Sequence, residues 1–254
     1  MTVRFTPGRR LGRGLSHLSV GSRYTTRRWL EETPVFEEMR RRAAVSRELP
    51  LRMVLRSHRR AIVASVVSTW MLTAAIVVVI LMTPSLLENL FRPAPNDAQL
   101  ANLAGTAALC LSTVAMGAAT DRFGIRRVSI PVLLLLITAT YGLYIGAGPL
   151  PSTLLPFYVL AGIGAGGAVL TPILMVHAFP PAVRFTGVSF SYNISYAVFG
   201  GMTPLLVSWL AHLNPLSPAH YIAAVTVLGL LTLQTAQTSH LTFAQNSGGP
   251  KPIK

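Results

Sequence analysis

Charged side chains are scarce over most of this sequence. No Asp, Glu, Lys or Arg occurs between Val128 and Val183, or between Phe185 and Pro250. Uncharged stretches of this length are not expected in a water-soluble domain, whereas about 20 apolar residues suffice for one helix to cross a bilayer. The mean hydropathy of +0.51 and the hydrophobic share of 51% agree with this interpretation. The chain is therefore expected to cross a membrane several times.

Cysteine and acidic residues are also rare. Cys110 is the single cysteine, so no intrachain disulfide can form, and no spacing typical of a metal site is present. After residue 60 the only acids are Glu88, Asp97 and Asp121, each at an expected membrane interface. The sequence thus offers no buried carboxylate as a proton relay. We expect neither a metal nor another cofactor.

These shortages argue against several enzyme classes. An aspartyl protease needs two buried Asp residues, and an intramembrane serine protease needs a Gly-x-Ser-Gly setting, whereas Ser189 follows Gly187 but precedes Phe190. Gly-rich phosphate loops and dinucleotide motifs are absent from the sequence. We expect no enzymatic activity. We also expect no nucleic-acid partner, because attraction to anionic lipids explains the basic residues.

The positions of the apolar and basic residues predict a topology. Apolar runs predict six membrane helices, at 61–82, 98–120, 128–148, 153–178, 186–212 and 221–238, the last being the weakest. Lys and Arg then fall before the first helix and in alternate loops, which predicts that both termini face the cytoplasm. The predicted fold class is an all-α polytopic membrane protein of six transmembrane helices, N-in and C-in.

One predicted cytoplasmic loop has a distinctive pattern. Its characteristic residues are Gly117, Asp121, Arg122, Gly124, Arg126 and Arg127. Gly117 would let a neighbouring helix approach, and Gly124 permits a backbone conformation closed to other residues. Asp121 can pair with an arginine, while Arg126 and Arg127 would hold the loop at the anionic leaflet. By residue type alone, a positive-inside loop with a charge pair is the simpler alternative.

The same loop resembles a pattern of the major facilitator superfamily, G-x-x-x-D-[RK]-x-G-[RK]-[RK]-[RK]. In that family it joins the second and third helices of each six-helix half. Ile125 departs from the pattern, which has a basic residue there. The resemblance implies a gating loop, to which we add Arg184 of the next cytoplasmic turn. It also leads us to expect that Asp121→Asn, which leaves Arg122 unpaired, is more damaging than Ile125→Arg.

A second segment narrows the resemblance. Residues 179–201 contain Phe-Pro, then Arg, Thr-Gly, Ser, Tyr-Asn and Phe-Gly-Gly in a fixed spacing. This is similar to the segment before and within the eleventh helix of the metabolite:proton symporters, the branch that carries citrate, 2-oxoglutarate, shikimate and proline/betaine. Residues 28–36 look like the central linker of that family. The resemblance covers residues 24–240 and implies a linker plus the C-terminal six helices of a truncated or split carrier.

This resemblance sets the expected domain organisation. Residues 1–23 match nothing in the family, and their Arg, Gly and Ser content is typical of a disordered basic lead. We expect a cytoplasmic linker over 24–60, the transmembrane bundle over 61–238 and a cytoplasmic tail over 239–254.

The fifth predicted helix is the best candidate for a substrate pathway. Ser189, Asn193 and Tyr196 recur on one helical face, and Tyr192 lies beside them. Polar groups in hydrocarbon need partners or water, so we expect this face to lie toward the bundle interior or a cavity. Interhelical hydrogen bonding alone would explain the same residues. The other pathway candidates are Thr69, Trp70 and Thr73 on the first predicted helix.

The function implied by the resemblance is transport of a small organic acid or zwitterion together with protons. The chain would be part of a secondary transporter in the plasma (inner) membrane, with anionic lipids around it. A separate N-terminal six-helix half is the expected protein partner. A non-transporting remnant or a membrane interaction subunit is the alternative.

Overall fold

The computed structural model describes residues 50–91, 97–148 and 151–246. The expected lead over residues 1–23 and most of the expected linker over 24–60 lie outside these ranges, together with residues 247–254. Every regular element in the described ranges is a helix. The all-α class is therefore confirmed for the part of the chain that the structure describes.

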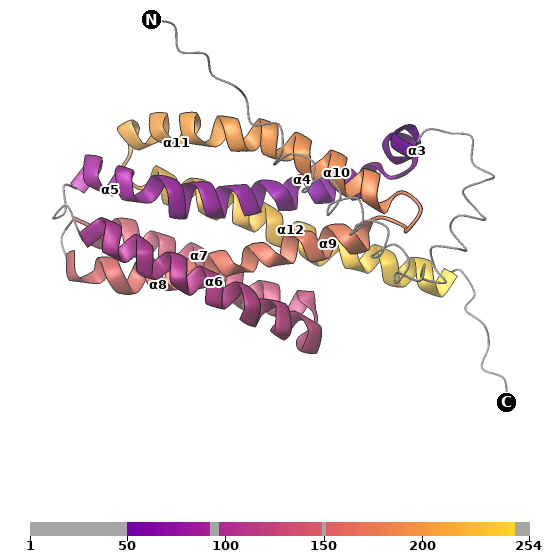
Figure 1. Ribbon diagram of the computed structural model, residues 1–254, viewed down its shortest axis with the longest axis horizontal. Coiled ribbons are helices and arrows are strands. Elements are labelled where there is room, and N and C mark those ends of the chain that lie inside the picture. The colour runs from indigo at the N-terminus through magenta and orange to yellow at the C-terminus, as the bar shows by residue number, and fades with distance from the viewer. Residues whose placement is uncertain (1–49, 92–96, 149–150, 247–254) are drawn as a thin grey trace, which may run out of the picture. The chain divides into compact units, whose positions relative to one another are not determined.

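In chain order, the described elements are α3 (Pro50–Ser57), α4 (Arg59–Ala74), the π-helix η1 (Ala75–Met82), α5 (Thr83–Phe91), α6 (Asp97–Phe123), α7 (Ile125–Gly146), the 3-10 helix η2 (Pro151–Thr153), α8 (Leu154–Ala165), the 3-10 helix η3 (Gly166–Val169), α9 (Leu170–Ala178), α10 (Arg184–Ser195), the π-helix η4 (Tyr196–Gly200), α11 (Gly201–Leu213) and α12 (Ser217–Asn246) (Figure 1).

Many of these elements join end to end. Within the described residues, five continuous helices are long and apolar enough to cross a membrane, namely Arg59–Phe91, Asp97–Phe123, Ile125–Gly146, Leu154–Ala178 and Arg184–Leu213. They overlap the first five predicted spans. The sixth predicted span falls within α12, a helix of 30 residues that is not one of these five. The sixth membrane span and the N-in, C-in orientation therefore stay predictions.

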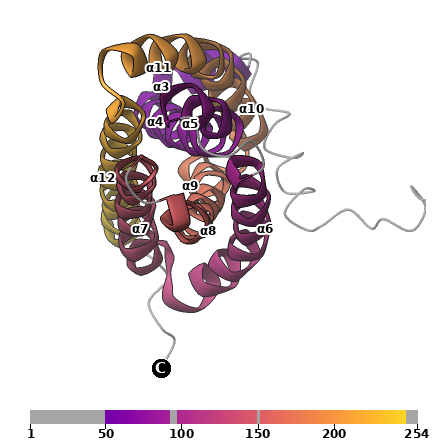
Figure 2. The ribbon, with the colours of Figure 1, turned by 90° about the vertical axis from the view of Figure 1, so that its left-hand side faces the viewer.

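The helices of this bundle run side by side. Seen from one end, α8 and α9 lie between α6 and α7, while α11 lies outermost, beyond α4 (Figure 2). The largest contacts join α8 to α6 and α7, and α12 to α4 and α7. A buried core of aliphatic side chains from α4, α7, α8 and α12 fills the space between them. The long apolar helices are thus held together by packing and not by charge.

A close contact joins α6 and α8. A Cβ atom on Gly162 would overlap the carbonyl oxygen of Gly105, and one on Gly105 would lie 2.7 Å from the Tyr158 ring. Ser112 crosses the same interface, where its hydroxyl donates a hydrogen bond of 2.7 Å to the carbonyl oxygen of Ile163. Small residues let two membrane helices approach in this way. The glycines of the fourth span act as close-packing residues.

The first span extends beyond its predicted end. The first predicted span ends at residue 82, two residues before Pro84, and proline usually disrupts a helix. In the structure, residues 75–82 instead widen into a π-helix, and the chain stays helical through Pro84 to Phe91. The prediction of this boundary was wrong.

The π-helix accommodates the proline by changing which groups pair. The backbone N–H of Thr83 donates to the carbonyl oxygen of Val78, five residues earlier. In that register the carbonyl oxygen of Val79 would need a donor from Pro84, which has none. The Tyr158 hydroxyl of α8 supplies it, at 3.0 Å. A buried carbonyl is thereby satisfied from a neighbouring helix, as an apolar environment requires.

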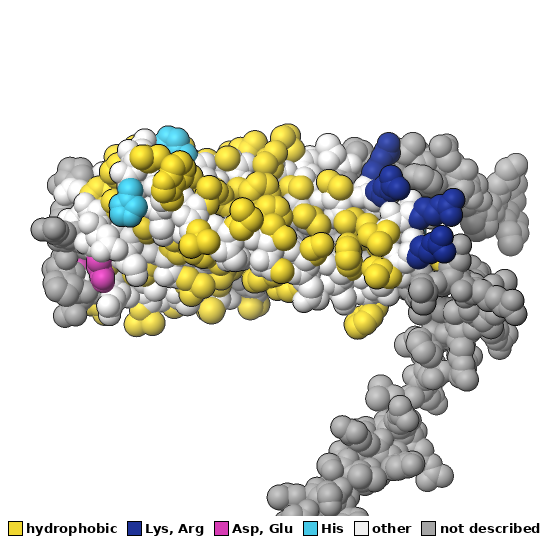
Figure 3. Space-filling model, turned by 90° about the horizontal axis from the view of Figure 1, so that it is seen from above, with side chains coloured by type: hydrophobic (Ala, Val, Ile, Leu, Met, Phe, Trp, Pro, Cys, Tyr) yellow, Lys and Arg dark blue, Asp and Glu magenta, His cyan; other side chains and the backbone are white. Residues whose placement is uncertain are grey.

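Charged side chains collect at the two ends of this bundle. The described arginines are Arg52, Arg56, Arg59, Arg60, Arg122, Arg126, Arg127 and Arg184. They lie on α3, at the start of α4, at the junction of α6 and α7, and at the start of α10, which are all at one end (Figure 1). Figure 3 shows basic side chains at one end of the visible face and an acidic side chain at the other. The apolar band between them fits a bilayer core.

Candidate functional site

An aromatic and polar cluster joins three helices in the apolar band. The Trp70 indole Nε1 on α4 donates to the Tyr221 hydroxyl of α12 at 2.8 Å. That hydroxyl also lies 2.7 Å from the Oγ1 of Thr203 on α11. The Trp70 ring stacks on Phe199, with ring centres 4.3 Å apart and planes 9° apart. An indole N–H in hydrocarbon needs such an acceptor, so this cluster fixes α12 against α4.

Of the predicted pathway residues, only Trp70 belongs to this cluster. Its partners on α11 and α12 were not predicted as site residues. The signal for Tyr221 is a tyrosine at the start of the sixth predicted span, whose hydroxyl must find a partner in an apolar environment. Sequence alone does not indicate which helix provides that partner.

The two threonines predicted beside Trp70 are fully buried. The Thr69 hydroxyl donates to the carbonyl oxygen of Ser65 at 2.8 Å, and the Thr73 hydroxyl donates to the carbonyl oxygen of Thr69 at 2.8 Å. Both hydroxyls are therefore satisfied within their own helix. Neither side chain is open to a cavity in the described bundle.

The predicted polar face of the fifth span lies partly at the surface of this bundle. Tyr192 has 39% of its surface exposed, and Asn193 is exposed. The Asn193 amide donates to the carbonyl oxygen of Ser189 at 2.8 Å. The Tyr192 and Tyr196 rings lie 4.8 Å apart. The structure thus brings these four residues together on one face, but the described helices do not enclose them.

A different face of α10 is buried. Ser191 and Ser195 are buried against the bundle, and the Ser195 hydroxyl donates to the carbonyl oxygen of Val66 on α4 at 3.0 Å. These serines lie one turn apart and were not predicted as contacts. Two polar stripes with helical spacing occur on this helix, and the sequence pattern does not show which one faces inward.

The predicted gating loop is almost entirely helical. Asp121 and Arg122 lie in the last turn of α6, and α7 begins at Ile125. Gly124 is the single residue between the two helices, with φ 82° and ψ 150°. This backbone region favours glycine, so the prediction for Gly124 is confirmed. By contrast, no described atom lies within 4 Å of a Cβ placed on Gly117, so the helix approach expected there is not made within this bundle.

Arg126 and Arg122 of this junction, and Arg184 at the start of α10, have partners other than those expected. The Arg126 Nε donates to the Gln234 side-chain oxygen at 3.0 Å, and the Gln234 amide donates back to the carbonyl oxygen of Arg126 at 3.1 Å. Arg126 therefore ties α7 to α12. The Arg122 guanidinium lies 5.5 Å from the centre of the Phe123 ring. Arg184 donates through Nε to the carbonyl oxygen of Phe179 at 3.2 Å.

The expected pairing of Asp121 is not made. Asp121 is exposed and forms no ion pair or hydrogen bond with another described side chain. The neighbouring Ile125, where the family pattern has a basic residue, is only 4% exposed and belongs to the hydrophobic core. These two observations lead us to expect the reverse order, with Ile125→Arg more damaging than Asp121→Asn. Ile125, the residue at which the sequence departs from the family pattern, thus belongs to the hydrophobic core.

All three described acids, Glu88, Asp97 and Asp121, are exposed. In the described ranges, no three His, Cys, Asp or Glu side chains come together in a group that could hold a metal ion. The chemistry that this bundle offers is hydrogen bonding and aromatic contact.

Comparison with curated proteins identifies distant relatives. The chain is 26% identical over 214 residues to the citrate-proton symporter of Klebsiella pneumoniae, a match that covers 82% of this chain and 47% of that protein. It is 27% identical over 226 residues to the inner membrane metabolite transport protein YhjE of Escherichia coli, with 83% and 50% covered. It is 34% identical over 125 residues to the proline/betaine transporter of Escherichia coli, with 46% and 24% covered.

These matches show distant homology, over part of the chain, to metabolite:proton symporters of the major facilitator superfamily. The chain spans about half the length of the relatives that it matches over most of its own length. No family model and no solved structure matches it. The relatives are transporters and not enzymes. With five apolar helices in its described part, the chain is a multi-pass membrane protein.

Proposed function

We propose that this chain forms one half of a proton-coupled secondary transporter for a small organic acid or zwitterion in the inner membrane. The observation that carries the proposal is homology over more than 80% of the chain to proteins that are about twice the length of the matched region. One relative is named for citrate and protons and another for proline and betaine, which supports this substrate class. The proposed arrangement has six spans and both termini in the cytoplasm.

The spans differ in how much of their surface is buried within the bundle, which supports the presence of a second half beside this chain. In the most apolar windows of the first, third and fourth spans, at least 50% of the residues are buried, compared with 17% for α6 and 22% for the α10 to α11 span. A second six-helix half would cover these two exposed helices. Between two halves, a water-filled cavity at the midplane is the usual substrate site of such carriers.

The exposed polar face of α10 fits that cavity. The Tyr192 hydroxyl and the Asn193 side chain would be costly against lipid, because nothing in hydrocarbon can hydrogen-bond to them. Facing water or a polar substrate, they would be satisfied. Ser189 and Tyr196 would complete the same wall.

Proton coupling would come mainly from the other half. Coupling needs a titratable group inside the membrane, and the described acids of this chain are all exposed near the ends of helices. The chain alone would therefore not use a proton gradient.

The test is uptake into proteoliposomes under an imposed proton gradient, with citrate and betaine as probes. The chain alone should show no uptake, and co-expression with a six-span N-terminal half should produce it. Asn193→Leu should then abolish uptake while membrane insertion is unchanged, whereas Asn89→Leu, at an exposed position outside the proposed cavity, should not.

Other outcomes would exclude the proposal or its assignment of the substrate pathway. Gradient-driven uptake by the purified chain alone would point to a self-sufficient homodimer. Two halves that assemble but transport nothing would favour the membrane interaction subunit. Uptake that survives Asn193→Leu would place the pathway elsewhere.

A further inference from the structure

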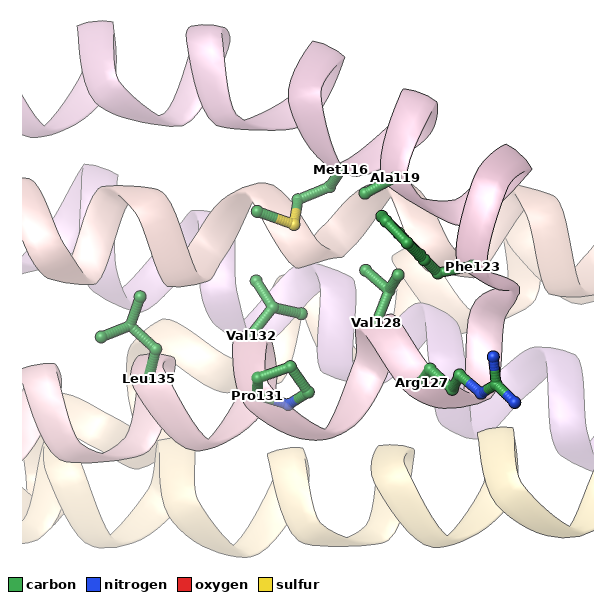
Figure 4. Close-up of a pocket in the computed structure, with 8 residues that line it drawn as sticks. All are labelled: Met116, Ala119, Phe123, Arg127, Val128, Pro131, Val132 and Leu135. Carbon is green, nitrogen blue, oxygen red and sulfur yellow. The ribbon is translucent and has the colours of Figure 1, made fainter.

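A groove lies between α6 and α7 near the basic end of the bundle. Its volume is about 400 Å³. The residues that line it are Met116, Ala119, Phe123, Arg127, Val128, Pro131, Val132 and Leu135 (Figure 4). Seven of these eight side chains are apolar, and Arg127 is the one charged group.

The groove exists because two consecutive helices share few contacts. α6 and α7 turn at Gly124 and then pack mainly against α8, not against each other. Pro131 adds an apolar ring to the wall, and Phe123, which is 53% exposed, closes the end beside the turn. The result is an apolar slot that runs along the helices and ends at a basic group.

Arg127 is the unpaired arginine of this junction. Arg126 is bonded to Gln234, and Arg122 lies against Phe123. Arg127 is exposed and makes no hydrogen bond or ion pair with another described residue. Figure 4 shows its guanidinium extending away from the apolar walls, at the end of the groove. The groove therefore joins an apolar slot to an available cation.

We propose that this groove binds one anionic phospholipid, with its phosphate on the Arg127 guanidinium and an acyl chain along the slot. From Arg127 to Leu135 the slot extends over eight residue-to-residue steps of α7, which is about 12 Å at 1.5 Å per step. Half of a hydrocarbon core of roughly 30 Å is about 15 Å, so the slot matches one leaflet. A guanidinium offers planar donors to phosphate and is drawn to anionic headgroups.

The proposal is independent of transport, and it is tested by lipid retention. The full chain is reconstituted in bilayers with equal amounts of phosphatidylglycerol and phosphatidylcholine, extracted in mild detergent and examined by native mass spectrometry. One phosphatidylglycerol per chain should remain bound. Arg127→Gln should reduce its retention roughly fivefold, the change expected for one arginine at a membrane surface.

Two matched controls separate the site from general surface effects. Arg60→Gln removes an exposed arginine at the same end of the bundle but away from the groove, and it should retain the lipid. Ala119→Trp fills the slot without changing charge and should release the lipid, whereas Ala118→Trp, at the neighbouring exposed position, should not. If Ala119→Trp does not fold, Arg127→Gln still decides the question.

Several results would overturn the proposal. Equal retention by Arg127→Gln and Arg60→Gln would mean that Arg127 does not hold the headgroup, and equal retention of phosphatidylcholine would exclude selection for an anionic lipid. Binding of glycerol phosphate alone, undiminished by Ala119→Trp, would assign the site to a free phosphate. Release of the lipid on addition of an N-terminal half would assign the groove to that protein.

Discussion

The hydroxyl of Tyr158 on α8 donates a hydrogen bond of 3.0 Å to the backbone carbonyl oxygen of Val79 in the first span. Proline at position 84 and the π-register of residues 75–82 leave this carbonyl without a backbone donor. The Tyr158 side chain of α8 thus makes it possible for Pro84 to lie inside the first span. Because Tyr158 is fully buried, water cannot take its place.

Tyr158→Phe should therefore destabilise the bundle by ~1–3 kcal/mol, the cost of a buried acceptor left without a donor. The measurement is the thermal or denaturant midpoint of the purified chain in detergent. Tyr144→Phe is the matched control, because the Tyr144 hydroxyl lies 3.0 Å from Thr83 Oγ1, which also donates to the Val78 carbonyl. Its effect should be smaller. A larger effect for Tyr144→Phe would contradict this account of the π-helix.

Ile125→Arg should be strongly destabilising, although it restores a residue of the family pattern. Ile125 is 4% exposed in the core, and a buried unpaired guanidinium costs more than ~2 kcal/mol. Ile130→Arg, at a position of the same helix that is 45% exposed, should be tolerated better. Asp121→Asn should be nearly neutral in the chain alone. The yield of monodisperse protein in detergent checks all three, and equal yields for the two arginine variants would mean that position 125 is not core.

The sequence predicted the features that depend on local composition. Runs of apolar residues located the five spans, and Gly124 was identified as a residue needing a special backbone conformation. Gly162 of the fourth span packs closely on α6, as a residue without a side chain permits. Each of these follows from residue type and spacing within a single helix.

The remaining features depend on contacts between distant segments. The partner of Arg126 is Gln234, 108 residues away, and no local pattern connects them. The π-helix depends on Tyr158 of another helix, so a sequence rule that stops helices at proline failed there. On α10, both Ser191 and Asn193 have helical spacing from other polar residues. Only the packing of α10 on α4 shows that the face with Ser191 and Ser195 is the buried one.

Reporter fusions should show an even number of spans. Fusions after Arg127, Arg184 and Lys254 should report the cytoplasm, because basic residues are retained on that side. Those after Asp97, Pro151 and Pro218 should report the opposite side. The fusion after Lys254 decides whether α12 crosses the membrane. If it reports the outside while the fusion after Arg184 reports the cytoplasm, the six-span arrangement is excluded.

The link between α4 and α12 should appear as coupling between Trp70 and Tyr221. Tyr221→Phe removes the acceptor of the Trp70 indole N–H and leaves this partly buried donor without a partner, at a cost of ~1–3 kcal/mol. Trp70→Phe keeps an aromatic ring against Phe199 but removes the donor. If the hydrogen bond joins the helices, the double variant should be less destabilised than the sum of the two single variants, by ~0.5–3 kcal/mol. The four unfolding free energies, measured in one detergent, give this coupling directly.

Val227→Ala, at an exposed position of the same helix, is the matched control and should show no coupling with Trp70→Phe. Additive losses for Trp70→Phe and Tyr221→Phe would mean that α12 is held by its aliphatic contacts alone.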